Sequence, residues 1–143
     1  MMDHATTQVI VIGAGAAGLL ASGISAGRGF STTLIEKNTL IGKKLLITGK
    51  GRCNVTNDCD VETFLRHVKT NGRFLYSALT QFTPQDMMHF LESLSLPLKV
   101  ERGQRVFPVS DRASDVVHTL EKWVKKTGCK DNACRGKEAL DRR

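Results

Sequence analysis

One run of residues near the N-terminus, VIVIGAGAAG at positions 9–18, constrains the fold of this chain more than any other feature. The four β-branched residues at 9–12 are typical of a strand that is buried on both faces of a sheet. The glycines that follow allow a sharp turn from this strand into a helix. Residues 32–36, TTLIE, then supply a second apolar strand that ends in an acid. This order of elements predicts a dinucleotide-binding βαβ unit.

Each position of the glycine motif has a mechanical reason. Gly13 permits the tight turn, Gly15 leaves room for phosphates to approach the backbone, and Gly18 lets the helix pack closely on the strand. The N–H groups and the dipole at the helix N-terminus favour an anion there. Glu36 is predicted to accept hydrogen bonds from ribose hydroxyls and to repel a 2′-phosphate. The motif therefore favours FAD or NAD over NADP, without choosing between the first two.

Size and composition set the broad class of the protein. The chain has 143 residues, of which 41% are hydrophobic, and this is enough for one domain with a single core. The apolar stretch from Val9 has no Lys or Arg before it and is interrupted by glycines, so it is not expected to be a signal peptide. No uninterrupted apolar stretch of about eighteen residues is present to span a bilayer. These features predict a cytoplasmic protein without a membrane partner.

Cysteine spacing and charge argue against two other classes of site. The four cysteines form no C-x-x-C pair, and with His67 or His118 they match no common zinc pattern, so reduced thiols and no metal centre are expected. The formal net charge is +7, but the basic residues are scattered and only 6% of residues are aromatic. A nucleic-acid partner is therefore not predicted.

The remaining sequence predicts mostly helices. Apolar spacing favours a helix at 16–26, helical structure at 61–82 with a break at 71–72, and a helix that starts with Thr83 as its cap and Pro84 at its first position. Residues 98–101 and 105–108 are predicted to form a short hairpin, and a further helix is expected from near Ser110 to Gly128. Residues 49–57 are predicted to form a loop. After Gly128 no apolar run remains for a third strand.

Two longer stretches carry a resemblance to a known family. GKKLLITGKGRCNVTN at 42–57 and RGQRVFPVSDRASDVV at 102–117 resemble the bacterial NAD(P)/FAD-dependent oxidoreductases, also described as aminoacetone oxidase family FAD-binding enzymes. The resemblance covers about residues 7–128. It implies an α/β fold: a Rossmann-like FAD-binding βαβ unit with added helices and an incomplete sheet, a truncated domain of the two-dinucleotide-binding flavoprotein type. It also implies FAD as cofactor, NAD(P)H as a candidate reductant and a small-molecule substrate that the sequence does not name.

By this resemblance the cofactor site combines the glycine motif with the loop at 49–54. Gly49 and Gly51 allow close approach of the backbone, and Arg52 and Asn54 are candidates to hydrogen-bond cofactor oxygens. Arg52 also has an alternative interpretation as a surface ion-pair residue, and Cys53 is better explained as a packed thiol than as a redox group. No catalytic residue is identified, since flavin carries the hydride chemistry. The predicted cofactor-binding residues are Gly13, Gly15, Ala16, Ala17, Gly18, Glu36, Lys37, Lys44, Gly49, Gly51, Arg52, Cys53 and Asn54.

Members of this family are much longer, with an inserted second domain and a C-terminal return of the chain that completes the FAD sheet. We therefore expect residues 1–128 to be a partial FAD-binding domain and residues 129–143 to be a polar tail, disordered or out of frame. Such a chain looks too short to be active alone. Two alternatives stay open at this point: a non-catalytic remnant of a flavoprotein, and an NAD-binding dehydrogenase domain. The oligomeric state is not predicted.

Overall fold

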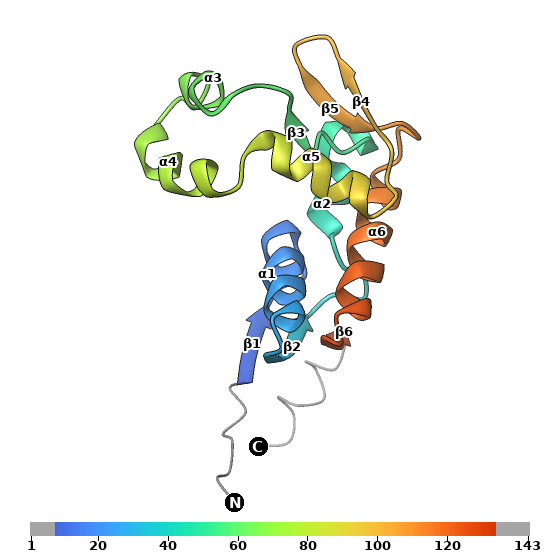
Figure 1. Ribbon diagram of the computed structural model, residues 1–143. Coiled ribbons are helices and arrows are strands. Elements are labelled where there is room, and N and C mark those ends of the chain that lie inside the picture. Colours follow the sequence, from blue (N-terminus) through green and yellow to red (C-terminus); the bar gives the residue numbers. More distant parts are fainter. Residues whose placement is uncertain (1–7, 134–143) are drawn as a thin grey trace, which may run out of the picture. The chain divides into compact units, whose positions relative to one another are not determined.

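The computed structural model describes residues 8–133, which form two compact units (Figure 1). The described residues of unit 1 are 8–46 and 117–133, and unit 2 takes in residues 47–116. Within the described residues, no helix is both long enough and apolar enough to cross a membrane. The predicted division at residue 128 stays a prediction.

Unit 1 is built on a parallel sheet in the order β1-β2-β6. β1 (Gln8–Ile12) is joined to β2 (Ser31–Glu36) by α1 (Ala16–Gly27), as the glycine motif predicts. In the register, Val9 lies opposite Thr32 and Ile12 lies opposite Ile35. The later part of α6 (Ala113–Lys126) packs against α1, where a Cβ at Gly23 would lie 2.2 Å from the Trp123 ring. The βαβ unit is therefore confirmed.

The third strand, β6 (Lys130–Ala133), pairs in parallel with β2, from Thr33 opposite Lys130 to Glu36 opposite Ala133. The prediction that no strand follows Gly128 is wrong. Sheet ladders are made by backbone groups, so a polar segment can join a sheet when the preceding element delivers it to a free edge. Here α6 and the left-handed turn at Gly128 (φ +83°) do so. Residues 134–143 of the predicted tail lie outside the described residues.

The prediction that β1 is buried on both faces is also wrong. Val11 faces α1, since its Cγ1 lies 3.6 Å from the position of a Cβ at Gly18. Ile10 and Ile12 alternate to the opposite face and are 62% and 83% exposed. The cause is that β1 is an edge strand and the described residues of unit 1 cover only one of its faces.

Unit 2 contains a small antiparallel sheet in the order β3-β5-β4. The predicted hairpin is confirmed: β4 (Leu98–Glu101) pairs with β5 (Arg105–Pro108), and β3 (Thr56–Asn57) pairs with the other edge of β5. Val106 and Phe107 of β5 are buried. Residues 49–57, which were predicted to form a loop, do so only in part, because a 3-10 turn (Thr48–Gly51) begins the segment and β3 ends it; α2 (Lys43–Ile47) precedes it. The 3-10 turn contains Gly49 and Gly51, and because glycines are typical of loops the sequence did not indicate this turn.

Three helices follow in unit 2: α3 (Val61–Arg66), α4 (Gly72–Gln81) and α5 (Pro84–Ser93). The predicted break at 71–72 is confirmed, with Asn71 in the left-handed conformation. The predicted cap of α5 is confirmed as a capping box between Thr83 and Asp86. The apolar spacing of this helix predicts that Met87, Met88, Phe90, Leu91 and Leu94 are buried; Leu91 is buried, whereas Met87, Met88, Phe90 and the C-cap residue Leu94 are half-buried.

Candidate functional site

The turn between β1 and α1 requires glycine at two positions. Gly13 has φ +96°, a left-handed conformation, and its N–H donates to the Ile35 carbonyl at 2.7 Å. A Cβ at Gly18 would lie 1.8 Å from the Gly13 carbonyl oxygen, so a side chain there cannot fit. The tight turn and the close packing of helix on strand, which the motif predicts, are both observed.

Gly15 differs from the other two glycines. Its φ is −81°, which any residue adopts, and a Cβ built there has no atom within 4 Å. Neither backbone conformation nor packing within the described part of unit 1 requires glycine at this position. Gly15 is the N-cap residue of α1, so no side chain caps the helix there. Ala16 and Ala17, the first two residues of α1, are exposed. The first N–H groups of α1 lack intrahelical partners and are suited to bind an anion.

Glu36 lies at the end of β2, and its side chain is hydrogen-bonded to the backbone of the glycine turn. Its side chain is 8% exposed; Oε2 accepts the Ala14 N–H at 2.8 Å, and Oε1 accepts the backbone N–H and the Nδ2 of Asn38 at 2.8 and 2.6 Å. These hydrogen bonds, the one from the Asn38 backbone first, lower the pKa of Glu36. An ionised carboxylate is therefore fixed beside the glycine turn.

The sequence does not identify Ala14 or Asn38 as parts of this arrangement. Ala14 contributes only its backbone N–H, and backbone donors leave no signal in residue type. Asn38 follows Glu36 by two positions, a spacing at which side chains commonly bond to nearby backbone, and this signal was available. Lys37 and Lys44, which were predicted to lie near the cofactor, are exposed and form no ion pair within residues 8–133.

Gly42 links the following loop to the same turn. Its N–H donates to the Ala14 carbonyl at 2.7 Å, and its φ is +63°. A Cβ there would lie 2.8 Å from Val117 Cγ2, so α6 also approaches too closely for a side chain. The first residue of the family-like stretch 42–57 is thus a packing element of unit 1.

The second predicted part of the site, residues 49–54, lies in unit 2 and has an unusual backbone. Gly49 and Gly51 are left-handed (φ +54° and +83°), and so are the non-glycine residues Lys50 and Cys53 (φ +58° and +61°). Left-handed non-glycine residues cost about 1–3 kcal/mol each and persist only where their surroundings hold them. A Cβ at Gly49 would lie 3.1 Å from Phe107 Cε1, which shows how closely this segment folds onto β5.

Arg52 is the residue that ties this segment to the hairpin. Its Nε donates to Asp111 Oδ1 at 2.7 Å, and its Nη2 forms an ion pair with Glu101. Its guanidinium also lies 4.1 Å from the centre of the Phe107 ring. Lys99 Nζ completes the network at 2.5 Å from Asp111 Oδ2. The geometry agrees with the interpretation of Arg52 as an ion-pair residue, while its contact with a cofactor stays a prediction.

Cys53 and Asn54 are also held by protein groups. Cys53 is 1% exposed, and burial raises the pKa of its thiol, as expected of a packed and protonated group. Its N–H donates to the Thr48 carbonyl at 3.0 Å. Asn54 accepts the Val106 N–H on Oδ1 at 3.2 Å, which fastens the segment to β5.

Replacing Arg52 with alanine is expected to lower the thermal unfolding midpoint of the protein at neutral pH, and replacing it with lysine to lower it less. Lysine keeps the charge but loses the planar fork and the stacking on Phe107. Circular dichroism melting curves measure both effects. Arg112→Ala is the matched control, because Arg112 is 71% exposed and pairs only with Asp115, three positions along the chain, within the described residues.

The same comparison has a predicted pH and salt dependence. Arg52 lowers the pKa of Glu101, and Lys99, followed by Arg52, lowers that of Asp111, from ordinary values of 4.5 and 3.8. The contribution of these two ionised carboxylates to the stability of the fold is complete when the pH is above their ordinary pKa values. It is lost as the pH falls through their lower pKa values in the folded protein. The difference between wild type and Arg52→Ala should therefore shrink in acid and in high salt. A difference that is constant with pH would contradict the ion-pair assignment.

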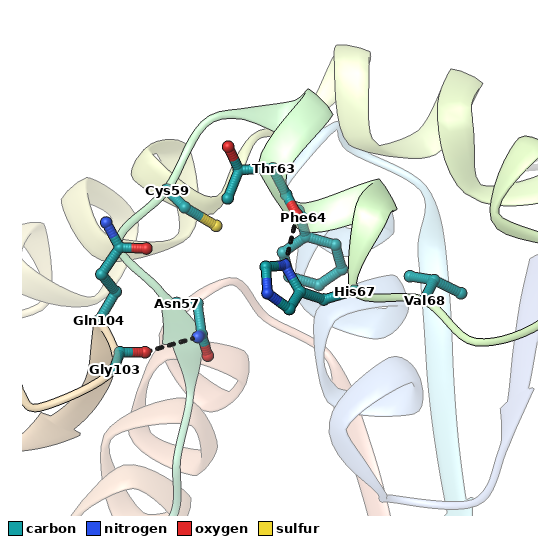
Figure 2. Close-up of a pocket in the computed structure, with 8 residues that line it drawn as sticks. All are labelled: Asn57, Cys59, Thr63, Phe64, His67, Val68, Gly103 and Gln104. Carbon is teal, nitrogen blue, oxygen red and sulfur yellow. Dashed lines mark hydrogen bonds between the residues drawn. The ribbon is translucent and has the colours of Figure 1, made fainter.

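A cavity of about 490 Å³ lies elsewhere in unit 2, between α3 and the turn of the hairpin (Figure 2). His67 donates from Nδ1 to the Thr63 carbonyl at 2.8 Å, and Asn57 donates from Nδ2 to the Gly103 carbonyl at 3.2 Å. Phe64, Val68 and Cys59 supply apolar surface. None of the predicted site residues lines this cavity, and the described part of the chain has no group of side chains suited to hold a metal ion.

A family model described as the HI0933-like protein Rossmann domain matches residues 7–137. The match extends past Gly128 and includes β6, which the sequence pattern did not indicate.

Curated relatives are similar over most of this chain. A 3-dehydro-bile acid Δ(4,6)-reductase of Clostridium scindens is 36% identical over 117 residues, covering 80% of this chain and 28% of that protein. A ribosomal RNA dihydrouridine synthase of Escherichia coli is 40% identical over 113 residues (79% and 28%), and that of Haemophilus influenzae is 32% identical over 124 residues (87% and 30%). The chain thus spans less than a third of the length of these relatives.

Solved structures give the same fold. The open conformation of a flavocytochrome c3 fumarate reductase matches with a TM-score of 0.63 and 26% identity, covering 93% of this chain and 27% of that one. The THI4 structure of Thermovibrio ammonificans matches with a TM-score of 0.59 and 15% identity, covering 90% and 38%. The predicted Rossmann-like α/β fold is confirmed.

Proposed function

This chain belongs to the HI0933-like Rossmann-domain family, and from that premise we propose that it is the FAD-binding part of a flavin-dependent oxidoreductase. The family resemblance that residues 42–57 and 102–117 suggest is confirmed by the match. In the proposal, FAD carries electrons or hydride, NAD(P)H serves as reductant, and the substrate is left open because the named relatives act on a bile acid and on ribosomal RNA.

The observation that carries the proposal is the glycine at position 15. Gly13 and Gly18 are explained by the backbone and packing of unit 1, but Gly15 has no such explanation among the described residues. A ligand that approaches the first turn of α1 would explain it, because a Cβ would stand between the N–H groups and a phosphate. Residues 15–17 would then hold the pyrophosphate of FAD.

Glu36 supplies the second half of the proposed contact. Its carboxylate lies next to the turn, accepting the Ala14 N–H at 2.8 Å, and it is held ionised by its hydrogen bonds. An ionised acid at this place accepts hydrogen bonds from the adenosine ribose and disfavours a 2′-phosphate. This favours FAD over NADP-type ligands for the glycine turn. Bound FAD would supply the redox chemistry, while unit 1 binds and orients its adenosine end.

The test is an FAD titration of the purified chain, followed by flavin absorption and fluorescence. We expect a yellow protein and saturable binding, with Gly15→Ala weakening FAD at least about tenfold, or roughly 1.4 kcal/mol. Gly27→Ala is the matched control: it lies at the other end of α1, and its Cβ would meet only Thr127 Cγ2 at 3.8 Å. Both variants should keep the wild-type circular dichroism spectrum.

Three results would contradict the proposal. One is a colourless protein that binds no FAD on reconstitution. Another is equal FAD affinity of the Gly15→Ala and Gly27→Ala variants. A third is tighter binding of NAD than of FAD, which would favour the dehydrogenase alternative.

A further inference from the structure

α3 and α4 form a second cleft in unit 2, on residues that none of the predicted contacts uses. The cleft has a volume of about 530 Å³, within the range of small-molecule sites, and is lined by Leu65, Arg66, Gly72, Arg73 and Tyr76. The two helices lie side by side (Figure 1), and Gly72 allows this, since a Cβ there would be 3.3 Å from the Leu65 carbonyl oxygen. Two arginines and an aromatic ring thus share one hollow.

The two arginines are available to an anion. Both are exposed, and neither forms an ion pair with a carboxylate within residues 8–133. Arg66 Nη2 donates one hydrogen bond to Thr63 Oγ1 at 2.9 Å, and most N–H groups of its guanidinium stay available to a ligand. The nearby acid, Asp60, caps α3 through the Thr63 N–H at 2.7 Å, and Arg66 contributes only a small part of the lowering of its pKa.

The stretch of sequence that forms most of the cleft is basic. No acidic residue occurs in the sequence between Glu62 and Asp86, while Lys69 adds a third exposed cation to Arg66 and Arg73. Unneutralised arginines at a concave site attract phosphate groups in particular, because the guanidinium fork matches the geometry of phosphate oxygens. The scattered charge of the whole chain had suggested no such site, but the fold gathers these residues.

Tyr76 adds a feature that a bare anion site does not need. It lies three positions after Arg73, on the same face of α4, and its side chain is 58% exposed. An exposed aromatic ring beside phosphate-binding arginines is the usual platform on which a nucleic base stacks. Leu65 supplies an apolar wall.

We propose that the cleft between α3 and α4 binds a nucleotide, with its phosphate on Arg66 and Arg73 and its base stacked on Tyr76. The site shares no residue with the glycine turn, lies wholly in unit 2, and does not depend on FAD binding. Two sources have this chemistry: a free nucleotide such as NAD(P)H, and a single-stranded nucleic acid.

The experiment measures binding by isothermal titration calorimetry without added FAD, because FAD is itself a nucleotide and would compete for the cleft; comparing wild type with variants that leave the glycine turn intact isolates binding at the cleft. The probes are AMP, NADPH, a ten-nucleotide oligouridylate, adenosine and inorganic phosphate. The variant Arg66→Ala/Arg73→Ala is expected to bind the tightest nucleotide probe at least about tenfold more weakly than wild type. The variant Arg102→Ala/Arg112→Ala removes the same charge from exposed positions of unit 2 and should stay within about threefold.

A second pair of variants tests the stacking step. Tyr76→Phe keeps the ring and should bind as wild type, whereas Tyr76→Ala should lose about fivefold or more. Tighter binding of NADPH than of the oligouridylate identifies a dinucleotide site. Tighter binding of the oligouridylate, with a steep salt dependence, identifies a site for single-stranded nucleic acid, and either result supports the proposal. Equal binding of AMP and inorganic phosphate, equal loss in both arginine variants, or no saturable binding would overturn it. These readouts do not change if the FAD proposal fails, because the arginine and tyrosine variants leave the glycine turn intact.

Discussion

Gly18→Ala is expected to destabilise unit 1 by about 3 kcal/mol or more, enough to unfold a marginal domain. The added Cβ would lie 1.8 Å from the Gly13 carbonyl oxygen, a backbone atom that cannot rotate away. Gly13 is itself fixed by its left-handed φ of +96° and by its 2.7 Å hydrogen bond to the Ile35 carbonyl. Relief of the clash therefore requires α1 to move off β1.

Urea denaturation followed by far-ultraviolet circular dichroism measures this effect. Gly27→Ala makes the same chemical change in the same helix, where the nearest atom is 3.8 Å away, and should leave the unfolding midpoint close to that of wild type. Equal midpoints for the two variants would show that the turn does not have the geometry described above. Because the readout is stability, the test is independent of any ligand.

The sequence predicted the βαβ unit because its local signals agree with one another. An apolar β-branched run, glycines at fixed offsets and an acid at the end of the second strand all require the same backbone path. The capping box of α5 and the hairpin of β4 and β5 were predictable for a similar reason, since each is encoded by residues within a few positions.

The features that sequence did not predict depend on distant partners. β6 has almost no strand propensity, and it forms where α6 brings the chain to the free edge of β2. The exposure of Ile10 and Ile12 depends on which elements cover β1, which residue type cannot reveal. Arg52 forms ion pairs with Glu101 and Asp111, which lie 49 and 59 residues further along the chain. The sequence therefore left its role as an ion-pair residue as one of two open interpretations.

Removing the carboxylate of Glu36 is expected to have the largest effect on cofactor binding. Glu36→Ala should weaken FAD about a hundredfold, or roughly 2.7 kcal/mol, because the ribose loses its acceptor and the Ala14 N–H loses its partner at 2.8 Å. Glu36→Gln should lose less, since an amide oxygen still accepts. The exposed Glu92→Gln is the control. Fluorescence titration with FAD gives all four affinities.

The pH dependence of stability tests the same residue without a cofactor. Hydrogen bonds from Asn38 and Ala14 hold the pKa of Glu36 below its ordinary 4.5, so its contribution to folding is complete above that value and is lost as the pH falls through the lower folded pKa. Glu36→Gln should therefore be less stable than wild type at pH 7 and approach it in acid. If the two proteins differ equally at both pH values, the carboxylate is not what holds the turn. If the stability difference behaves as expected but FAD affinity is unchanged, Glu36 serves the fold alone and the ribose contact is absent.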